Sequence, residues 1–225
     1  MADGAEGGLG RALGRIEMKW IVLVMMVAGL TVDGRDLGEV LKAVERRYNG
    51  AATLESRFEQ RHLVQGRPRR AEAGRLVLRK PGRMRWEYSQ PAGKLFVSDG
   101  KWVWFYSAGE KRAEKAKLKE ADDFRAPLAF LLGRLDFKRT FGDFEAQEVG
   151  GETVIVALPK SERLPYRRVE FTVTGENVIR RLVVRGVDGT DMEFVFSGER
   201  LNVAVGEGEF RFVAPAGVVV EEVGK

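Results

Sequence analysis

The stretch Gly74-Arg-Leu-Val-Leu-Arg-Lys-Pro-Gly-Arg-Met-Arg-Trp-Glu-Tyr88 holds two runs of alternating side chains separated by Pro81-Gly82. In the second run, apolar or aromatic side chains stand at the even positions from Met84 to Tyr88, and charged ones stand at the odd positions. Successive side chains of a β-strand point to opposite faces of its sheet. The stretch therefore predicts a β-hairpin with one apolar surface and one ionic surface.

Strand-like segments of the same kind occur on both sides of this hairpin. They occupy residues 54–62, 74–80, 83–88, 95–98, 102–106, 144–149, 152–158, 167–173, 178–185 and 190–196, with an edge strand expected within 107–120. Turn signals such as Asp99-Gly100 separate them. About eleven short strands predict a mainly β (α+β) fold in which an antiparallel sheet curls into a barrel or half-barrel. The chain shows neither βαβ alternation nor a glycine-rich nucleotide-binding motif.

Two segments have helical patterns. Asp36 and Glu39 form a capping box, apolar residues recur on one face as far as Tyr48, and Gly50 provides a stop. The second segment, residues 122–133, is strongly apolar towards its end. We expect this second helix to cover the open apolar face of the curled sheet, which would otherwise be exposed to water.

The composition excludes several kinds of site. The 225 residues include no Cys and a single His, which rules out disulfides, Cys-based zinc sites, thiol nucleophiles and clusters of histidine ligands. We accordingly predict no metal site and no cofactor. The chain is long enough for one domain, and its 44% of hydrophobic residues can form a substantial core. Its 38 Lys and Arg against 33 Asp and Glu make it moderately basic.

The N-terminal part is typical of a secretion signal. Residues 21–30 are apolar apart from Gly29 and follow Lys19, and this run is about half as long as the roughly 20 residues that a membrane-spanning helix needs. We therefore predict an upstream extension at 1–17, a cleaved signal peptide at 18–34 and a single mature domain at 36–225. A buried N-terminal helix is the alternative. No Cys follows the apolar run, so we expect a protein without a lipid anchor, released into the periplasm or outside the cell.

The hairpin at 74–88, together with Gln90-Pro91 and the aromatic run at 95–106, closely resembles the LolA family of periplasmic outer-membrane lipoprotein carriers. Further matches to the family are Leu54-Glu-Ser-Arg-Phe-Glu-Gln60, Ala126-Pro127 and Phe210-Arg-Phe-Val-Ala-Pro-Ala-Gly217. The resemblance spans roughly residues 36–222. It implies an incomplete antiparallel β-barrel with a helical lid over an apolar cavity.

The resemblance also implies a function and partners. Members of the family take acylated lipoproteins from an inner-membrane Lol ABC exporter and pass them to the outer-membrane receptor LolB. LolB has the same fold but is itself a lipoprotein, so the absence of Cys favours the carrier. The chain is thus expected to be a monomeric, non-enzymatic chaperone of lipoprotein transport in the periplasm.

On this resemblance, apolar residues of the strands and the lid line an acyl-chain cavity. The residues expected there are Phe58, Leu76, Leu78, Met84, Trp86, Leu128, Leu131 and Leu132. In the family, a basic residue directly before the Pro of the hairpin turn hydrogen-bonds the lid and holds the closed form. Lys80 occupies that position and is the expected lid latch. The alternative is that this aromatic strand face is an ordinary packed core.

A cluster of cations between Arg67 and Arg85 fits a different function, the binding of nucleic acid. Small barrels that combine cations with aromatic residues can bind single-stranded nucleic acid. The secretion signal argues against a nucleic-acid partner, and a solvated face or a docking rim for an acidic partner is the simpler interpretation. The cations are Arg67, Arg69, Arg70, Arg79, Lys80, Arg83 and Arg85.

The sequence is also compatible with two further functions, an enzyme and an envelope sensor or glycolipid carrier. Asp122-Asp123, or Ser98-Asp99 beside His62, could suggest an enzyme, but no nucleophile elbow, metal-ligand cluster or phosphate loop accompanies them. An envelope sensor or glycolipid carrier with the same fold requires the same apolar pocket. The sequence does not separate that function from lipoprotein transport.

Overall fold

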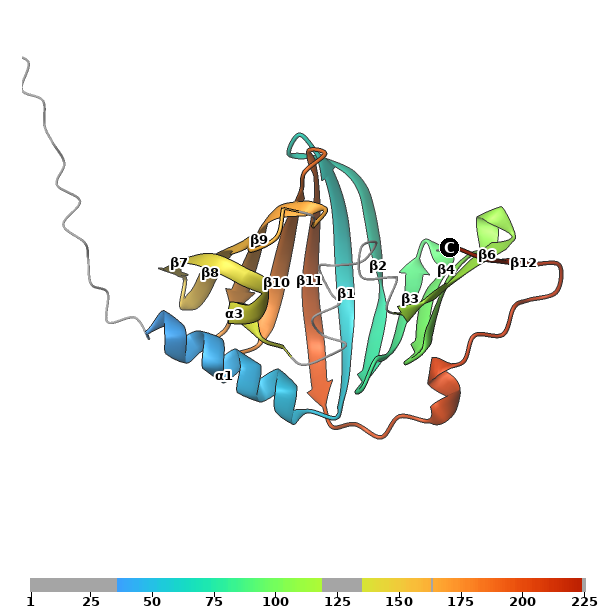
Figure 1. Cartoon of the computed structure of the whole chain (residues 1–225), viewed down its shortest axis with the longest axis horizontal. Helices are drawn as coiled ribbons and strands as arrows, with labels where there is room; N and C mark the ends of the chain where they lie inside the picture. The colour runs from blue at the N-terminus through green and yellow to red at the C-terminus, as the bar shows by residue number, and fades with distance from the viewer. Residues whose placement is uncertain (1–35, 119–134, 163, 224–225) are drawn as a thin grey trace, which may run out of the picture. The chain divides into compact units, whose positions relative to one another are not determined.

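The computed structural model describes residues 36–118, 135–162 and 164–223, all within one compact unit, Asp33–Lys225 (Figure 1). The predicted extension at 1–17, signal peptide at 18–34 and lid helix at 122–133 lie outside the described residues. Leu128, Leu131 and Leu132, predicted to line the cavity from the lid, therefore lie outside them as well.

The described part of the chain is built on one sheet of twelve strands. They are β1 (Thr53–Val64), β2 (Arg67–Arg79), β3 (Arg83–Gln90), β4 (Ala92–Asp99), β5 (Trp102–Ser107), β6 (Arg112–Lys117), β7 (Phe141–Val149), β8 (Glu152–Pro159), β9 (Tyr166–Val173), β10 (Ile179–Gly186), β11 (Thr190–Leu201) and β12 (Val219–Glu222). Their order is β12-β6-β5-β4-β3-β2-β1-β11-β10-β9-β8-β7, so β12 and β7 are edges that do not pair with each other. The predicted mainly β, incomplete barrel is confirmed as an open sheet.

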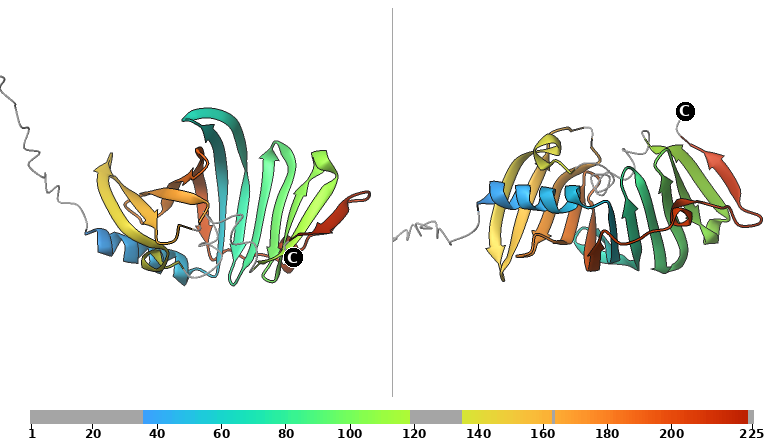
Figure 2. Two further views of the ribbon diagram at one scale, coloured as in Figure 1. Left: turned by 45° about the horizontal axis from the view of Figure 1, so that its top comes forward. Right: turned by 90° about the horizontal axis from the view of Figure 1, so that it is seen from below.

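Short helices complete the described fold: α1 (Leu37–Gly50), α3 (Phe137–Thr140) and the 3₁₀ turns η1 (Ala108–Glu110) and η3 (Glu207–Phe210). The predicted cap of α1 is confirmed, because the Asp36 side chain accepts a hydrogen bond from the backbone N–H of Glu39 at 3.1 Å. The apolar stripe of α1 from Val40 to Tyr48 is buried. Figures 1 and 2 show α1 lying across the strands from β7 to β11.

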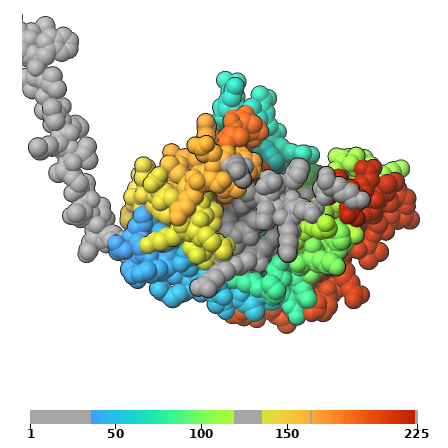
Figure 3. Space-filling model, viewed as in Figure 1, coloured from blue at the N-terminus to red at the C-terminus, as the bar shows by residue number. Residues whose placement is uncertain are grey.

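The twelfth strand, β12, was not predicted. Its four residues are all exposed, and it pairs with β6 in parallel, whereas the other neighbouring strands are antiparallel. In Figure 3, the red C-terminal residues lie against the green ones of β6. A strand with neither face buried carries no alternation that would reveal it. The sheet is therefore mixed, and it has one strand more than the predicted eleven.

The hairpin between β1 and β2 is longer than the sequence indicated. Residues 67–70, which lie between the predicted strands at 54–62 and 74–80, belong to β2, and the turn consists of Gln65 and Gly66, which both have positive φ. Two left-handed residues match the twist of the flanking strands. The tip is exposed, so burial imposes no alternation there. Its cations Arg67 and Arg69 form no side-chain ion pair with any other residue that the structure describes.

The two faces of the sheet have different partners. Directly opposed residues of an antiparallel pair share a face, and the ladder aligns Leu76, Trp86 and Phe96 in one row. These side chains belong to the same hydrophobic core as the buried stripe of α1, and we call their side the inner face. The adjacent row, which contains Val77 and Val97, points the opposite way and defines the outer face.

The segment between β11 and β12 covers part of the outer face. Its turn η3 lies against β3 and β4, and Phe210 is buried there. The Phe212 ring stacks on the Trp104 ring with their centroids 6.2 Å apart. Trp104 therefore points outward, whereas Val103 and Phe105 of the same strand pack with the inner core.

The same segment pairs with cations of the basic stretch. Glu207 forms ion pairs with Arg79 at 2.8 Å and Arg83 at 2.7 Å. Glu209 lies 3.9 Å from Arg85. These cations are tied to the protein's own carboxylates, which favours the solvated ionic face over a surface for nucleic acid.

Gly74, the first residue of the quoted stretch, allows a close approach between strands. It lies opposite Phe58 in β1 and Tyr88 in β3, at a register shift. A Cβ at Gly74 would stand 1.9 Å from the carbonyl oxygen of Glu87 and 2.9 Å from the Phe58 ring. A side chain at this position would collide with backbone, which explains the glycine in the strand. The Phe58 and Tyr88 rings meet beside it at 5.1 Å, edge to face.

Gly74→Ala is expected to lower the free energy of unfolding by about 2 kcal/mol, because the β3 backbone must move to admit the methyl group. Gly109→Ala is the control, since an added Cβ there meets no atom within 4 Å. Urea denaturation followed by tryptophan fluorescence measures both variants. Equal stability of the two would show that the register shift adapts and that the close approach is not required.

Candidate functional site

Five of the predicted cavity residues lie together on the inner face. They come from three neighbouring strands, and the ladder sets Leu76 opposite Trp86 and Leu78 opposite Met84. Phe58 joins them from β1. Each has only 1–4% of its surface exposed, and all belong to one hydrophobic core. The inner face is therefore an apolar surface shared by β1, β2 and β3.

Aromatic rings form the middle of the inner face. The Trp86 ring lies 4.6 Å from Phe58 and 5.7 Å from Phe194, measured between centroids. Phe194, from β11, and Phe96, from β4, were not among the predicted residues, yet both are buried in the same core. The even-position alternation within 190–196 was the signal that could have identified Phe194.

Trp86 carries an unpartnered polar atom on this apolar surface. Its indole Nε1 is buried and has no hydrogen-bond partner within residues 36–118, 135–162 and 164–223. An indole N–H can only donate, and a buried donor without an acceptor costs about 1–3 kcal/mol. The inner face thus offers one hydrogen-bond donor to any molecule that brings an acceptor into contact with it.

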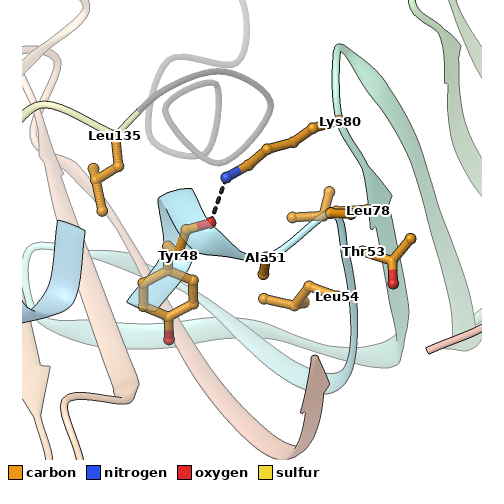
Figure 4. Close-up of a pocket in the computed structure, with 8 residues that line it drawn as sticks. Tyr48, Ala51, Thr53, Leu54, Leu78, Lys80 and Leu135 are labelled. Carbon is orange, nitrogen blue, oxygen red and sulfur yellow. Dashed lines mark hydrogen bonds between the residues drawn. The ribbon is translucent and has the colours of Figure 1, made fainter. Parts of the chain in front are cut away.

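A small pocket lies where α1 ends (Figure 4). It is lined by Tyr48, Ala51, Ala52, Thr53, Leu54, Leu78, Lys80 and Leu135. Its volume of ≈ 10 Å³ leaves room for about one water molecule. This end of the inner face is therefore closed by side chains of α1, β1 and β2.

Lys80 joins the β2 end to α1 across this pocket. Its Nζ donates a hydrogen bond to the backbone carbonyl oxygen of Tyr48, in the last turn of the helix (Figure 4). A cation is favoured there because the last carbonyl groups of a helix are unpaired and carry partial negative charge. Burial lowers the pKa of the Lys80 ammonium. The predicted latch residue thus contacts α1, while any contact with residues 122–133 lies outside the described part.

The opposite side of the same helical turn is fixed to β10 and β11. The Tyr48 hydroxyl donates to Glu199 at 2.7 Å and accepts from the backbone N–H of Ile179 at 2.9 Å. Arg47 donates to the other carboxylate oxygen of Glu199 at 2.6 Å. Burial, reinforced by the Glu199 charge, raises the pKa of Tyr48, so its hydroxyl keeps the proton that it donates.

The helix α1 also holds the chain that follows the undescribed segment 119–134. The Asn49 side-chain amide exchanges two hydrogen bonds with the backbone of Leu135, both 2.8 Å long. The Glu45 carboxylate accepts from the backbone N–H of Phe137 at 2.8 Å. The Phe137 ring packs edge-on against Phe171 of the sheet at 5.2 Å. Residues 135–137 therefore form one cover with α1.

Residues 49–213 match the family described as "Outer membrane lipoprotein carrier protein LolA". The chain belongs to the LolA family. The outer-membrane lipoprotein carrier protein of Chromobacterium violaceum is 32% identical over 173 residues, which cover 76% of this chain and 82% of that protein. The protein of the same name from Nitrosospira multiformis is 31% identical over 206 residues, covering 89% and 95%.

The fold of this LolA-family chain is also similar to a solved structure. An uncharacterized conserved protein from Thermus thermophilus superimposes with a TM-score of 0.50 at 14% identity, over 83% of this chain and 98% of that one. At this identity the similarity concerns the fold alone.

Of the residues considered for catalysis, Asp122 and Asp123 lie outside the described residues, whereas Ser98 and Asp99 have structural partners. Ser98 Oγ donates to the Gly82 carbonyl at 2.7 Å, and Asp99 accepts from the backbone N–H of Trp102 at 2.7 Å. Both therefore stabilise turns. No group of three or more His, Asp or Glu that could hold a metal occurs in the described ranges. The helices that the structure describes include none both long and apolar enough to cross a membrane.

Tyr48→Phe is expected to lower the free energy of unfolding by about 1–3 kcal/mol, because the Ile179 N–H and the Glu199 carboxylate each lose a buried partner. Tyr106→Phe is the matched control, since that ring lies against Phe212 on the outer face. Thermal and urea unfolding measure both. A Tyr48→Phe protein as stable as the control would mean that the α1 end is not fixed by this hydroxyl.

Proposed function

We propose that this chain is a periplasmic carrier that binds the acyl chains of lipoproteins on its inner face and shuttles them from the inner to the outer membrane. The supporting observation is the aromatic inner face of β1, β2 and β3, which an open sheet cannot bury against itself. Membership of the LolA family supports the same function. The proposed acyl-chain contacts in the described residues are Phe58, Leu76, Leu78, Met84 and Trp86, with Leu128, Leu131 and Leu132 as the proposed lid contacts.

The energetics fit a carrier that does no chemistry of its own. Each acyl methylene gains about 0.8 kcal/mol on leaving water, so two or three chains of about sixteen carbons gain on the order of 25 to 35 kcal/mol. A bilayer offers nearly the same gain. Carriage is then an exchange between two apolar surroundings, and loading takes its energy from a partner. We propose an inner-membrane Lol ABC exporter as that partner and a LolB-type receptor as the acceptor.

Where the structure is described, binding requires the packed side chains of the inner face to rearrange. The inner-face side chains pack against one another, and the pocket beside α1 has room for about one water molecule only. Acyl chains on the inner face therefore take the place of contacts that these side chains make within the core. The Trp86 indole N–H, which lacks an acceptor, would gain one from an ester carbonyl of the incoming lipid.

The arrangement along the chain completes the proposal. A signal peptide at 18–34 would deliver a single domain, residues 36–225, to the periplasm, where it would act as a monomer. The mature domain would bind and release its cargo without catalysing a reaction.

Mass spectrometry of the protein purified from its native envelope without detergent is the direct test. We expect acylated lipoproteins to copurify, because their release into water would cost the transfer energy of every exposed methylene. Free glycolipid in their place would reassign the chain to the envelope lipid carriers, and an empty protein would count against carriage altogether.

Bromine-labelled acyl chains test the inner face itself. A lipopeptide whose acyl chains carry bromine should quench wild-type tryptophan fluorescence through Trp86, which lies among the inner-face rings. Trp86→Phe should lose most of that quenching, whereas Trp104→Phe should retain it because Trp104 stacks on Phe212 at the outer face. Quenching that disappears only in Trp104→Phe would place the lipid on the outer face and refute the proposal.

Replacing Lys80 tests the latch. Lys80→Met removes the donor to the Tyr48 carbonyl, so a fluorescent acyl probe should enter several-fold faster in stopped-flow mixing. Lys80→Arg retains a donor and should stay close to wild type. Lys42→Met is the surface control, because Lys42 is exposed and its ion pair among the described residues is with the exposed Glu39 on α1. Unchanged entry rates in Lys80→Met would remove the latch role from this residue.

A further inference from the structure

Glu72 of β2 carries a second unpartnered polar atom. Its side chain has no exposed surface, and its Oε1 lies 2.8 Å from Lys94 Nζ and 3.0 Å from Arg70 Nε. The other carboxylate oxygen, Oε2, is buried and has no hydrogen-bond partner among the residues that the structure describes. A buried carboxylate oxygen left without a donor is costly, and such groups in native structures call for an explanation.

The neighbouring histidine does not satisfy this oxygen. The Tyr88 hydroxyl donates to Gln60 Oε1 at 2.9 Å, and burial, together with the Glu72 charge, raises the pKa of Tyr88 and keeps that proton in place. Gln60 therefore presents its Nε2 to His62 Nε2, 2.6 Å away, and the histidine nitrogen must be the acceptor. His62 Nε2 then has no proton for Glu72 Oε2, which lies 3.5 Å from it.

The polar side chains of Glu72, Gln60 and His62 lie on the inner face, at the end away from Lys80. Glu72 is opposite Gln60 in the ladder, two residues beyond the Phe58–Gly74 pair, so these side chains share the face of the aromatic rings. Lys94 also lines an open pocket of ≈ 300 Å³ together with Phe105, Tyr106, Ser107, Glu110, Arg112 and Glu114. A pocket of that size accommodates a small polar group. The inner face thus has an apolar middle and one buried polar end.

We propose that Glu72 Oε2, with Lys94 beside it, is a binding site for an amide N–H at the acylated terminus of the cargo. This inference rests on the proposed carrier function and adds a polar contact to it. The amide is either the one that joins an acyl chain to the terminal nitrogen or the first peptide bond of the cargo. Both offer the same chemistry, a neutral N–H next to long hydrocarbon chains.

The local charges favour a neutral donor. Arg70 and Lys94 already place two cations on the single carboxylate of Glu72, so a third cation such as a free ammonium would meet net positive charge. A phosphate group could pair with these cations, but it brings no N–H for Oε2. A free fatty acid has no donor when ionised. An amide N–H satisfies Oε2 at no charge cost, and its carbonyl can accept from the Lys94 ammonium.

The first arm of the test changes the protein. In Glu72→Gln, Arg70 and Lys94 should hold the amide oxygen in the place of Oε1. The amide Nε2 then stands in the place of Oε2, so a donor replaces the acceptor. Titration with a synthetic triacylated cysteinyl peptide should show about tenfold weaker binding than wild type. Binding of a fluorescent long-chain alcohol, which lacks an amide, should not change. Glu59→Gln is the matched control, because Glu59 is exposed on the other face of β1.

The second arm changes the ligand and keeps the wild-type protein, so it decides the question even if Glu72→Gln fails to fold. Two further peptides carry an N-methyl group, one on the acyl amide and one on the first peptide bond. We expect one of them to bind wild type about tenfold more weakly than the parent, and that one identifies the amide. In Glu72→Gln the same methyl group should have no further effect.

The outcomes separate the two proposals. If both N-methyl peptides bind wild type as well as the parent does, the Glu72 site is overturned, while retained binding of the parent leaves the carrier function in place. If wild type binds neither the triacylated peptide nor the long-chain alcohol, the carrier function itself is overturned. A loss of affinity for the alcohol as well in a folded Glu72→Gln protein would also contradict the site, because it would show a general change of the inner face.

Discussion

The structure depends on an apolar face that its own sheet cannot enclose. A closed barrel would turn this face inward on all sides, but β7 and β12 stay apart as edges, so part of the cover must come from elsewhere. The helix α1 supplies it, and its buried stripe forms one core with rings such as Phe58 and Trp86. The cover is held at one helical turn by polar contacts, through Lys80 and Glu199. These contacts join the helix end to the sheet through side chains and are not part of the strand ladder.

How far the sequence predicts this fold depends on burial. Where one face is buried, as along Arg83–Gln90 or on the stripe of α1, the residues show a period of two or 3.6, and the predicted elements are confirmed. Where both faces meet water, the period vanishes. The hairpin tip at 67–70 and the strand β12 were missed for that reason.

The contacts of the candidate site can likewise be predicted from the sequence only in part. The pairing of Leu78 with Met84 follows from strand parity about the turn at Pro81-Gly82, so it could be anticipated. The contact between Lys80 and Tyr48 could not be located by periodicity, because it depends on how α1 docks against the end of β2. The unpartnered oxygen of Glu72 is further out of reach, since hydrogen bonds can be counted only when every neighbour is known.

The parallel pairing of β12 has a consequence for the last residues of the chain. Its backbone occupies hydrogen-bonding groups of β6 that would otherwise form a free sheet edge beside the aromatic strand β5. Free edges are templates on which another molecule can add a strand. The strand β12 ends in Glu221 and Glu222, whose like charges discourage stacking of copies. These few exposed residues thus replace the longer edge of β6 by a short and charged one, on which another strand pairs less readily, and a chain cut before Val219 would leave β6 itself as the edge.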